Sequence, residues 1–183
     1  MTPLINETLF KQHSPVTSNT SVAEFVPYIC IAQELHIEKV LGTPLMSLLK
    51  EEVTGNRLTS QNSDLILHIA PALSFYAVYQ ALPFHWATIV NKGITIRESE
   101  NSRGIDIKDL AQLRHWIKDD ADVLLNQLID FLCSHREDYP LWRPKDDCCS
   151  RTETEGDARR TFDSGFYFAK KKNCCHNHPT IIR

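Results

Sequence analysis

Glycine is scarce in this sequence, with six residues in a chain of 183, and no window approaches the ~20 consecutive apolar residues that span a bilayer. The first shortage excludes a collagen-like or glycine-rich linker protein. Because long apolar windows are absent, we do not expect a membrane span. Residues 1–11 also lack the basic start and the apolar core of a signal peptide. We therefore expect synthesis in the cytoplasm, where cysteine thiols stay reduced.

Common catalytic and nucleotide-binding motifs are absent as well. The chain contains no glycine-rich dinucleotide or phosphate-binding loop, no G-x-S-x-G nucleophile turn and no H-E-x-x-H zinc motif. No other arrangement of residues predicts a catalytic site. We therefore expect neither an enzyme nor a bound cofactor.

What is present is typical of a folded globular protein. Hydrophobic residues make up 42% of the chain and charged residues 23%, and the length fits one domain with an additional segment. The charge is uneven: residues 1–144 hold 12 Lys and Arg against 17 Asp and Glu, whereas residues 145–183 hold eight against six. Because nucleic-acid binding needs clustered Lys and Arg, the acidic first part argues against a nucleic-acid-binding domain.

Apolar spacing predicts helices through most of residues 21–144. The first helix is expected to follow a capping box formed by Ser21 and Glu24, and to end at Gly42. Residues 1–20, in contrast, are polar, and we expect them to form an extended arm that packs on a neighbour.

Two more helices are expected next along the chain. Thr43-Pro44 fits the N-cap and the first position of the second helix. The third is expected to be capped by Ser63 or Asp64 and is apolar on almost every side. Pro71 is expected to bend it and Pro83 to end it. A helix of this kind lies in the centre of a fold or at a subunit interface.

The longest helix is expected from Asp106 or Asp109 to Leu132, with one apolar and one charged side. Before it, Gly93–Arg97 alternates apolar and polar residues and predicts a short strand. Adjacent carboxylates on a helix do not face one another, so we interpret the acidic residues of the charged side as solvated. These residues are Asp119, Asp120 and Asp122.

Tryptophan occurs at three positions that fit either of two roles. Trp86, Trp116 and Trp142 are large enough to anchor a core, and tryptophan is also enriched at the centres of protein interfaces. The sequence leaves both roles open.

The last 39 residues hold the candidate metal ligands. Four of the six cysteines form two adjacent pairs there, and two histidines follow the second pair. They could close a structural zinc site, form disulfides, or be incidental residues of a polar tail. Adjacent cysteines fit one zinc ion poorly and no C-x-x-C pair is present, so no metal ligand is predicted. The residues concerned are Cys148, Cys149, Cys174, Cys175, His176 and His178.

The order of several short segments points to a known family. The segments are Tyr28-Ile29 to Ala32-Gln33, Val40 to Leu45, Ile69 to Leu73, Gly93 to Ile96, and Asp138 to Trp142. Together they cover roughly residues 20–143. In this order the chain resembles the small all-helical head–tail connector proteins (adaptor or head-completion proteins) of tailed bacteriophages, closest to those of phages and prophages of Bacteroides-type hosts.

This resemblance implies an all-α fold: a helical bundle with one long central helix, a short β-hairpin or protruding loop, and an extended C-terminal arm. The domains would be an N-terminal arm (1–20), a helical connector domain (21–144) and a C-terminal tail (145–183). It also implies a structural protein of the virion, located at the junction of portal and tail. About twelve copies would form a ring that binds the portal protein and the next tail or connector protein. Packaged DNA would pass through the ring without sequence-specific binding, and no membrane is involved.

Two segments are expected to bind these partners. The loop around Gly93–Gly104 would face the lumen or a neighbouring ring, and the tail would reach the portal. The expected partner-binding residues are Gly93, Ile94, Thr95, Ile96, Arg97, Arg103, Phe162, Phe166, Tyr167, Phe168, Lys170, Lys171 and Lys172. The alternative is a small zinc-binding regulatory protein that uses the Cys/His-rich tail.

Overall fold

The computed structural model of the chain describes residues 2–17, 19–90, 93–96 and 106–143, with the backbone alone for residues 88–90 and 93–96. Residues 1–150 form one compact unit, and residues 151–183, the second unit, lie outside the described residues.

Helices make up most of the described chain, so the expected all-α class is confirmed. The elements in chain order are α1 (Glu7–His13), the 3₁₀ turn η1 (Val22–Glu24), α2 (Val26–Ala32), the π-helical segment η2 (Gln33–Ile37), α3 (Glu38–Leu41), α4 (Thr43–Thr54), α5 (Ser60–Trp86), β1 (Ala87–Val90), β2 (Gly93–Ile96) and α6 (Ile107–Ser134).

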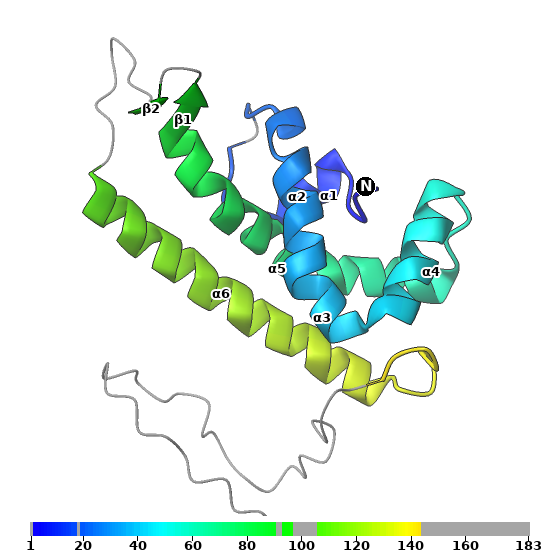
Figure 1. The fold of residues 1–183 in the computed structure, drawn as a ribbon. Coiled ribbons are helices and arrows are strands. Elements are labelled where there is room, and N and C mark those ends of the chain that lie inside the picture. The colour runs from blue at the N-terminus through cyan, green and yellow to red at the C-terminus, as the bar shows by residue number, and fades with distance from the viewer. Residues whose placement is uncertain (1, 18, 91–92, 97–105, 144–183) are drawn as a thin grey trace, which may run out of the picture. The chain divides into compact units, whose positions relative to one another are not determined.

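The long helix α5 is the centre of the fold. It contacts α1, α2 and η2, and α6 runs alongside it (Figure 1). Its apolar residues are buried in many turns, with Leu65, Ile69 and Leu73 fully inaccessible. Burial of each such side chain contributes about 1.5–3 kcal/mol, so the nearly uniform apolar sequence of α5 is explained by packing on several neighbours.

By length and composition alone, α5 also satisfies the requirements for a membrane-crossing helix. A window of 18 residues within it has a mean hydropathy of 1.5, which corrects the expectation that no segment reaches this level. However, 61% of that window is buried inside the protein. The hydropathy of α5 is therefore accounted for by its place in the core.

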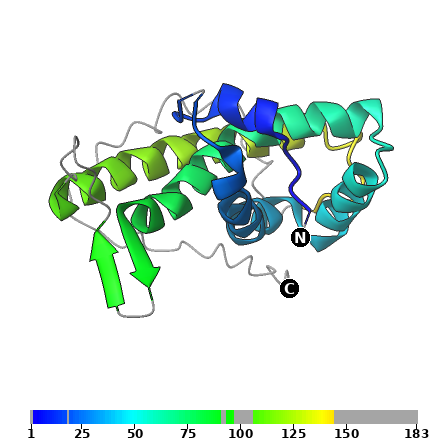
Figure 2. The same cartoon turned by 90° about the horizontal axis from the view of Figure 1, so that it is seen from above.

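The ends of α5 differ from those predicted from the sequence. The helix begins at Ser60 and is capped by Thr59 instead of Ser63 or Asp64, because the Thr59 hydroxyl accepts a hydrogen bond from the Asn62 amide. It also continues past Pro83 to Trp86, so the predicted end at Pro83 is wrong. Pro71 lies inside the helix, and Figures 1 and 2 both show α5 changing direction in its middle, as an internal proline requires.

The expectation of an extended N-terminal arm is wrong for residues 7–13, which form α1. The Asn6 side chain caps this helix by accepting a hydrogen bond from the Leu9 amide. Phe10 is fully buried, and Leu4 and Ile5 belong to the same core as α5. The segment therefore packs on its own chain, which a polar composition alone does not predict.

Residues 26–41 form one continuous helical path through α2, η2 and α3. Ser21 makes no side-chain cap bond, and the 3₁₀ turn η1 precedes the helix, so the predicted capping box is wrong. Gly42 ends the path as predicted, with a φ of +78° that favours glycine. Gly42 also serves as N-cap of α4, and the Thr43 hydroxyl donates a hydrogen bond to Glu38 instead of capping.

β1 and β2 form an antiparallel pair directly after α5. Ala87 lies opposite Ile96, and Val90 lies opposite Gly93. Figure 2 shows the pair pointing away from the helices. The predicted strand at Gly93–Arg97 corresponds to β2 up to Ile96, and Arg97 lies outside the described residues.

α6 and the turn after it close the described core. Asp106 is the N-cap of α6, one of the two predicted starts, and the helix runs two residues beyond the predicted end, to Ser134. Tyr139 and Trp142 are buried. The Trp142 indole donates a hydrogen bond to the Val40 carbonyl at 2.9 Å, which ties the end of this unit to α3.

Candidate functional site

Exposed apolar side chains on the path through α2, η2 and α3 are the first candidate. Pro27, Ile31, Leu35 and Lys39 recur every four residues and are all exposed, with 43% exposure for Ile31 and 44% for Leu35. We call this set the α2 stripe. Large apolar side chains aligned on one exposed face point to a contact surface.

The π-helical turn explains why the exposed residues of the α2 stripe recur every four positions. A π-helix bonds residue i to i+5 and has a wider turn than an α-helix, so residues four apart drift less around the axis. Burial follows the same step on the opposite side, because Gln33, Ile37 and Leu41 are all buried. A regular 3.6-residue repeat would group Leu35 with the buried Ile29 and Ala32, but the π-turn leaves it exposed.

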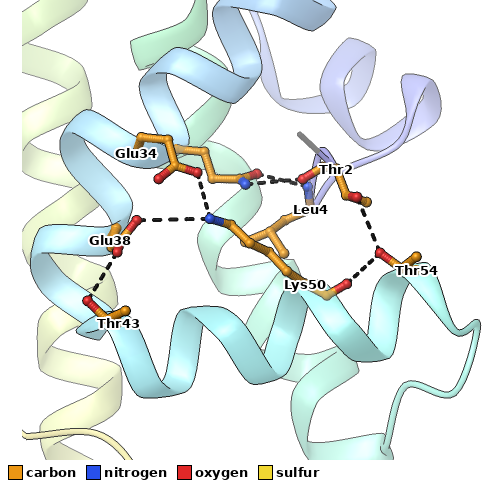
Figure 3. A network of polar contacts seen from close by, with 8 residues as sticks. Thr2, Leu4, Glu34, Glu38, Thr43, Lys50 and Thr54 are labelled. Atoms are coloured by element: carbon orange, nitrogen blue, oxygen red, sulfur yellow. Dashed lines mark hydrogen bonds and ion pairs between the residues drawn. The ribbon is translucent and has the colours of Figure 1, made fainter.

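Polar contacts with the N-terminal segment and with α4 hold η2, the middle part of the α2 stripe. The buried amide of Gln33 accepts a hydrogen bond from the Leu4 N–H at 2.9 Å and donates one to the Thr2 carbonyl at 3.2 Å. On the side facing α4, Lys50 forms ion pairs with Glu34 at 2.6 Å and Glu38 at 3.9 Å (Figure 3). The hydrogen bond from Lys50 lowers the pKa of Glu34, so this contact is ionic at neutral pH.

The outer side of α6 is the second candidate surface. Trp116 and Val123 are two turns apart and are 59% and 58% exposed. Asp119 and Asp120 lie between them and are exposed as well. We call these four residues the α6 outer face. Of the two roles that the sequence left open for tryptophan, the exposed position of Trp116 favours contact with a partner, while Trp142 is in the core.

A polar cluster lies at the junction of η2, α5 and α6. It consists of His36, Tyr76, Gln80, Lys118 and Asp122. The Tyr76 hydroxyl donates a hydrogen bond to the Asp122 carboxylate, and Lys118 donates one to the same carboxylate at 2.7 Å. The His36 ring stacks on Tyr76 with their centroids 3.8 Å apart. We call this set the junction cluster.

Burial and hydrogen bonding set the protonation states in the junction cluster. Burial lowers the pKa of His36, with Lys39 adding to the effect, so its ring is neutral at pH 7. Burial and the bond to Asp122 raise the pKa of Tyr76. For Asp122, burial acts to raise the pKa, but the hydrogen bonds from Lys118 and Tyr76 outweigh it and lower the pKa. Asp122 is therefore held by two specific partners, while its side chain keeps the partial exposure (45%) that the solvated interpretation implies, and Asp119 and Asp120 are exposed.

The residues predicted from the sequence to bind partners are not brought together among the described residues. Gly93 to Ile96 form β2, of which the backbone is described. The remaining ones lie outside the described residues, namely Arg97, Arg103, Phe162, Phe166, Tyr167, Phe168, Lys170, Lys171 and Lys172. The four tail cysteines, His176 and His178 lie outside as well. In the described part, no group of three or more His, Cys, Asp or Glu could hold a metal ion.

Comparison with known families places the chain in one family. Residues 37–152 match a family of unknown function (DUF6712), and because the match spans more than half of the chain, the protein belongs to this family. The match begins in η2 and includes α4, α5 and α6. Neither the curated proteins nor the solved structures contain a match to the chain.

Proposed function

We propose that this protein is a structural subunit of a phage head–tail connector, which forms a ring between the portal and the tail and extends the DNA channel. The observation that carries the proposal is the pair of exposed surfaces, the α2 stripe and the α6 outer face. A subunit of a closed ring meets its two neighbours through two different surfaces. An exposed tryptophan has a role in such a contact that it lacks in an isolated monomer.

The charge of the chain supports the same function. Residues 1–144 carry five more acidic than basic residues, counting Asp and Glu against Lys and Arg. A channel that bound phosphate groups tightly would hold the genome in place, because each neutralised phosphate adds to the affinity. An acidic subunit repels the DNA backbone and lets it slide.

The hairpin formed by β1 and β2 supports a role in contacting the lumen or a neighbouring ring. It follows the end of α5 and points away from the helices (Figure 2). In this proposal Gly93–Ile96 and the following Arg97 and Arg103 make that contact. The tail would bind the portal through its aromatic residues Phe162 to Phe168 and through Lys170 to Lys172, which suit an acidic surface.

The test is to mix the full chain with the portal protein of the same phage and to image the product by electron microscopy, with its mass measured in parallel. We expect a ring of added density coaxial with the portal. A monomer that does not bind the portal and carries one zinc ion per chain would overturn the proposal in favour of the zinc-binding alternative. Reversing the charges of Arg97 and Arg103 tests the loop assignment, which fails if assembly and DNA retention stay unchanged.

A further inference from the structure

We infer that copies of this chain associate by packing the α6 outer face of one copy against the α2 stripe of the next. The inference deepens the proposed function and rests on it for the ring, but the contact itself is argued from the two surfaces. The stripe lies mainly on α2 and η2 and the outer face lies on α6, all of which contact α5, and the residues of both surfaces are exposed. Each copy therefore offers one surface of each kind.

The two surfaces match in apolar character, and the α2 stripe is long enough to cover the α6 outer face. Ile31, Leu35 and Pro27 give an apolar strip on one helix, and Trp116 and Val123 give two large apolar side chains on the other. At 1.5 Å per residue, the stripe from Pro27 to Lys39 spans roughly 18 Å, and the step from Trp116 to Val123 spans roughly 10 Å. The smaller patch therefore fits within the longer one when the helices lie side by side.

The surfaces also match in charge. The α2 stripe ends in Lys39, while its neighbours Glu34 and Glu38 already pair with Lys50. On the α6 outer face the carboxylates of Asp119 and Asp120 lie between the two apolar residues. Among the described residues, neither Lys39 nor Asp120 has an ion-pair partner within 4.0 Å, and Asp119 has only His115, at 3.5 Å. A pair between Lys39 and Asp120 of the next copy would fix the register of the contact.

The two surfaces consist of different residues, so each copy binds one neighbour through its α2 stripe and another through its α6 outer face. A copy that uses its stripe toward one neighbour still has its outer face for another, so the contact propagates from copy to copy and closes into a ring where the rotation allows. Two chains that each lack one surface can then form a single contact and stop there. This property separates the inferred contact from an interface in which each patch binds its own copy.

The first experiment uses that property. Leu35→Glu removes the stripe and Trp116→Glu removes the outer face, and each variant alone is expected to lose self-association by about tenfold or more. An equimolar mixture is expected to give a species of two chains, measured by native mass spectrometry. Leu67→Glu is the matched control, because Leu67 is an equally exposed leucine (50%) on α5 outside both surfaces. A mixture that stays monomeric while the wild type associates would overturn the inference.

The second experiment locates the contact directly. A photo-crosslinking amino acid at position 116 is introduced into the full chain, and labelled and unlabelled copies are mixed at high concentration and, separately, with the portal. We expect hybrid products that join position 116 to a peptide within residues 27–39. A crosslink to residues 145–183 of the same chain, a crosslink to another surface, or no hybrid product in either mixture would overturn the inference.

The two proposals fail in different ways. Rings on the portal without a crosslink between position 116 and residues 27–39 would overturn the inferred contact and leave the connector function standing. The crosslink without portal binding would support the contact and contradict the connector function.

A charge exchange gives an independent check: Lys39→Asp and Asp120→Lys are each expected to weaken association, and the two changes combined in one chain are expected to restore it.

Discussion

At the scale of single residues, Gln33 has the most consequential polar contacts. Its side chain is fully buried and joins η2 to the backbone of Leu4 and Thr2. Gln33→Ala leaves the Leu4 amide without this acceptor, so we expect the free energy of unfolding to fall by about 1–3 kcal/mol. Urea unfolding followed by circular dichroism measures it. Gln112→Ala, at an exposed position of α6, is the control and should change stability little. Equal effects in both variants would contradict the assigned role.

The pH dependence of stability also depends on a single residue. The folded state lowers the pKa of His36 below its ordinary value of 6.5, so the folded chain binds this proton less readily than the unfolded chain. The contribution of His36 is therefore complete above pH 6.5 and is lost as the pH falls through the lowered value. Tyr76, Gln80 and Asp122 face the ring, with Lys39 and Lys118 nearby.

We expect His36→Gln to flatten the fall in unfolding free energy between pH 7 and pH 5, measured by urea titration at several pH values. Gln112→Ala, which changes an exposed residue without a titratable group, is the control and should keep the slope of the wild type. If both variants keep that slope, His36 is not responsible for it. Asp122 makes the free energy of unfolding fall further in acid. Its pKa is lowered in the folded state, so its contribution is lost only below its ordinary pKa of 3.8.

At the scale of elements, the junction between α3 and α4 depends on one glycine. Gly42 has φ +78° and ψ 153°, a conformation that non-glycine residues adopt only at a cost of about 1–3 kcal/mol. A Cβ there would meet only Pro44 at 3.8 Å, so the expected destabilisation of Gly42→Ala comes from the backbone alone. Gly55→Ala is the control for the backbone conformation, since its φ is −80°; its Cβ would lie 3.1 Å from the flexible Arg57 side chain and 3.3 Å from the Glu51 carbonyl oxygen. Thermal unfolding that is equal for both variants would contradict this account.

Replacing the tryptophan of α6 and the tryptophan after it is expected to affect stability very differently. Trp142 is 3% exposed and bonded to Val40, so Trp142→Ala should lower the free energy of unfolding by about 3–5 kcal/mol. Trp116 is 59% exposed, and Trp116→Ala should change the stability of the monomer by no more than about 0.5 kcal/mol. Denaturant unfolding at low protein concentration measures both. A large loss for Trp116→Ala would mean that its side chain supports the fold itself.

Element by element, the sequence predicted most of the helices but not their boundaries or all of their faces. The apolar stripe of α6 and the stop at Gly42 follow from local signals, and both were predicted. The start of α5 at Ser60 depends on which of several possible residues caps the helix. Its continuation through Pro83 depends on tertiary packing. The exposure of Leu35 does not follow from a regular helical repeat, because that repeat does not contain the π-turn. The hydrogen bond from Tyr76 to Asp122 was not predicted because the two residues are far apart in the sequence.

At the scale of the whole molecule, the division into two units gives the last prediction. Residues 1–150 form a compact unit, and Tyr139 and Trp142 belong to its core near the end. We therefore expect the chain that lacks residues 151–183 to unfold with the same free energy as the full chain. It should also keep the contact between the α2 stripe and the α6 outer face. In contrast, it should lose attachment to the portal, because the aromatic and lysine residues proposed to bind there are removed.

Thermal unfolding, crosslinking from position 116 and portal binding, measured on the full and the shortened chain, separate these expectations. A full chain with Lys170, Lys171 and Lys172 changed to Glu is the matched control for charge, and it should weaken portal binding without changing stability. If the shortened chain still binds the portal as tightly as the full chain, the tail is not the arm that reaches it. The portal contact must then lie on the first unit, where the hairpin formed by β1 and β2 is the next segment to change.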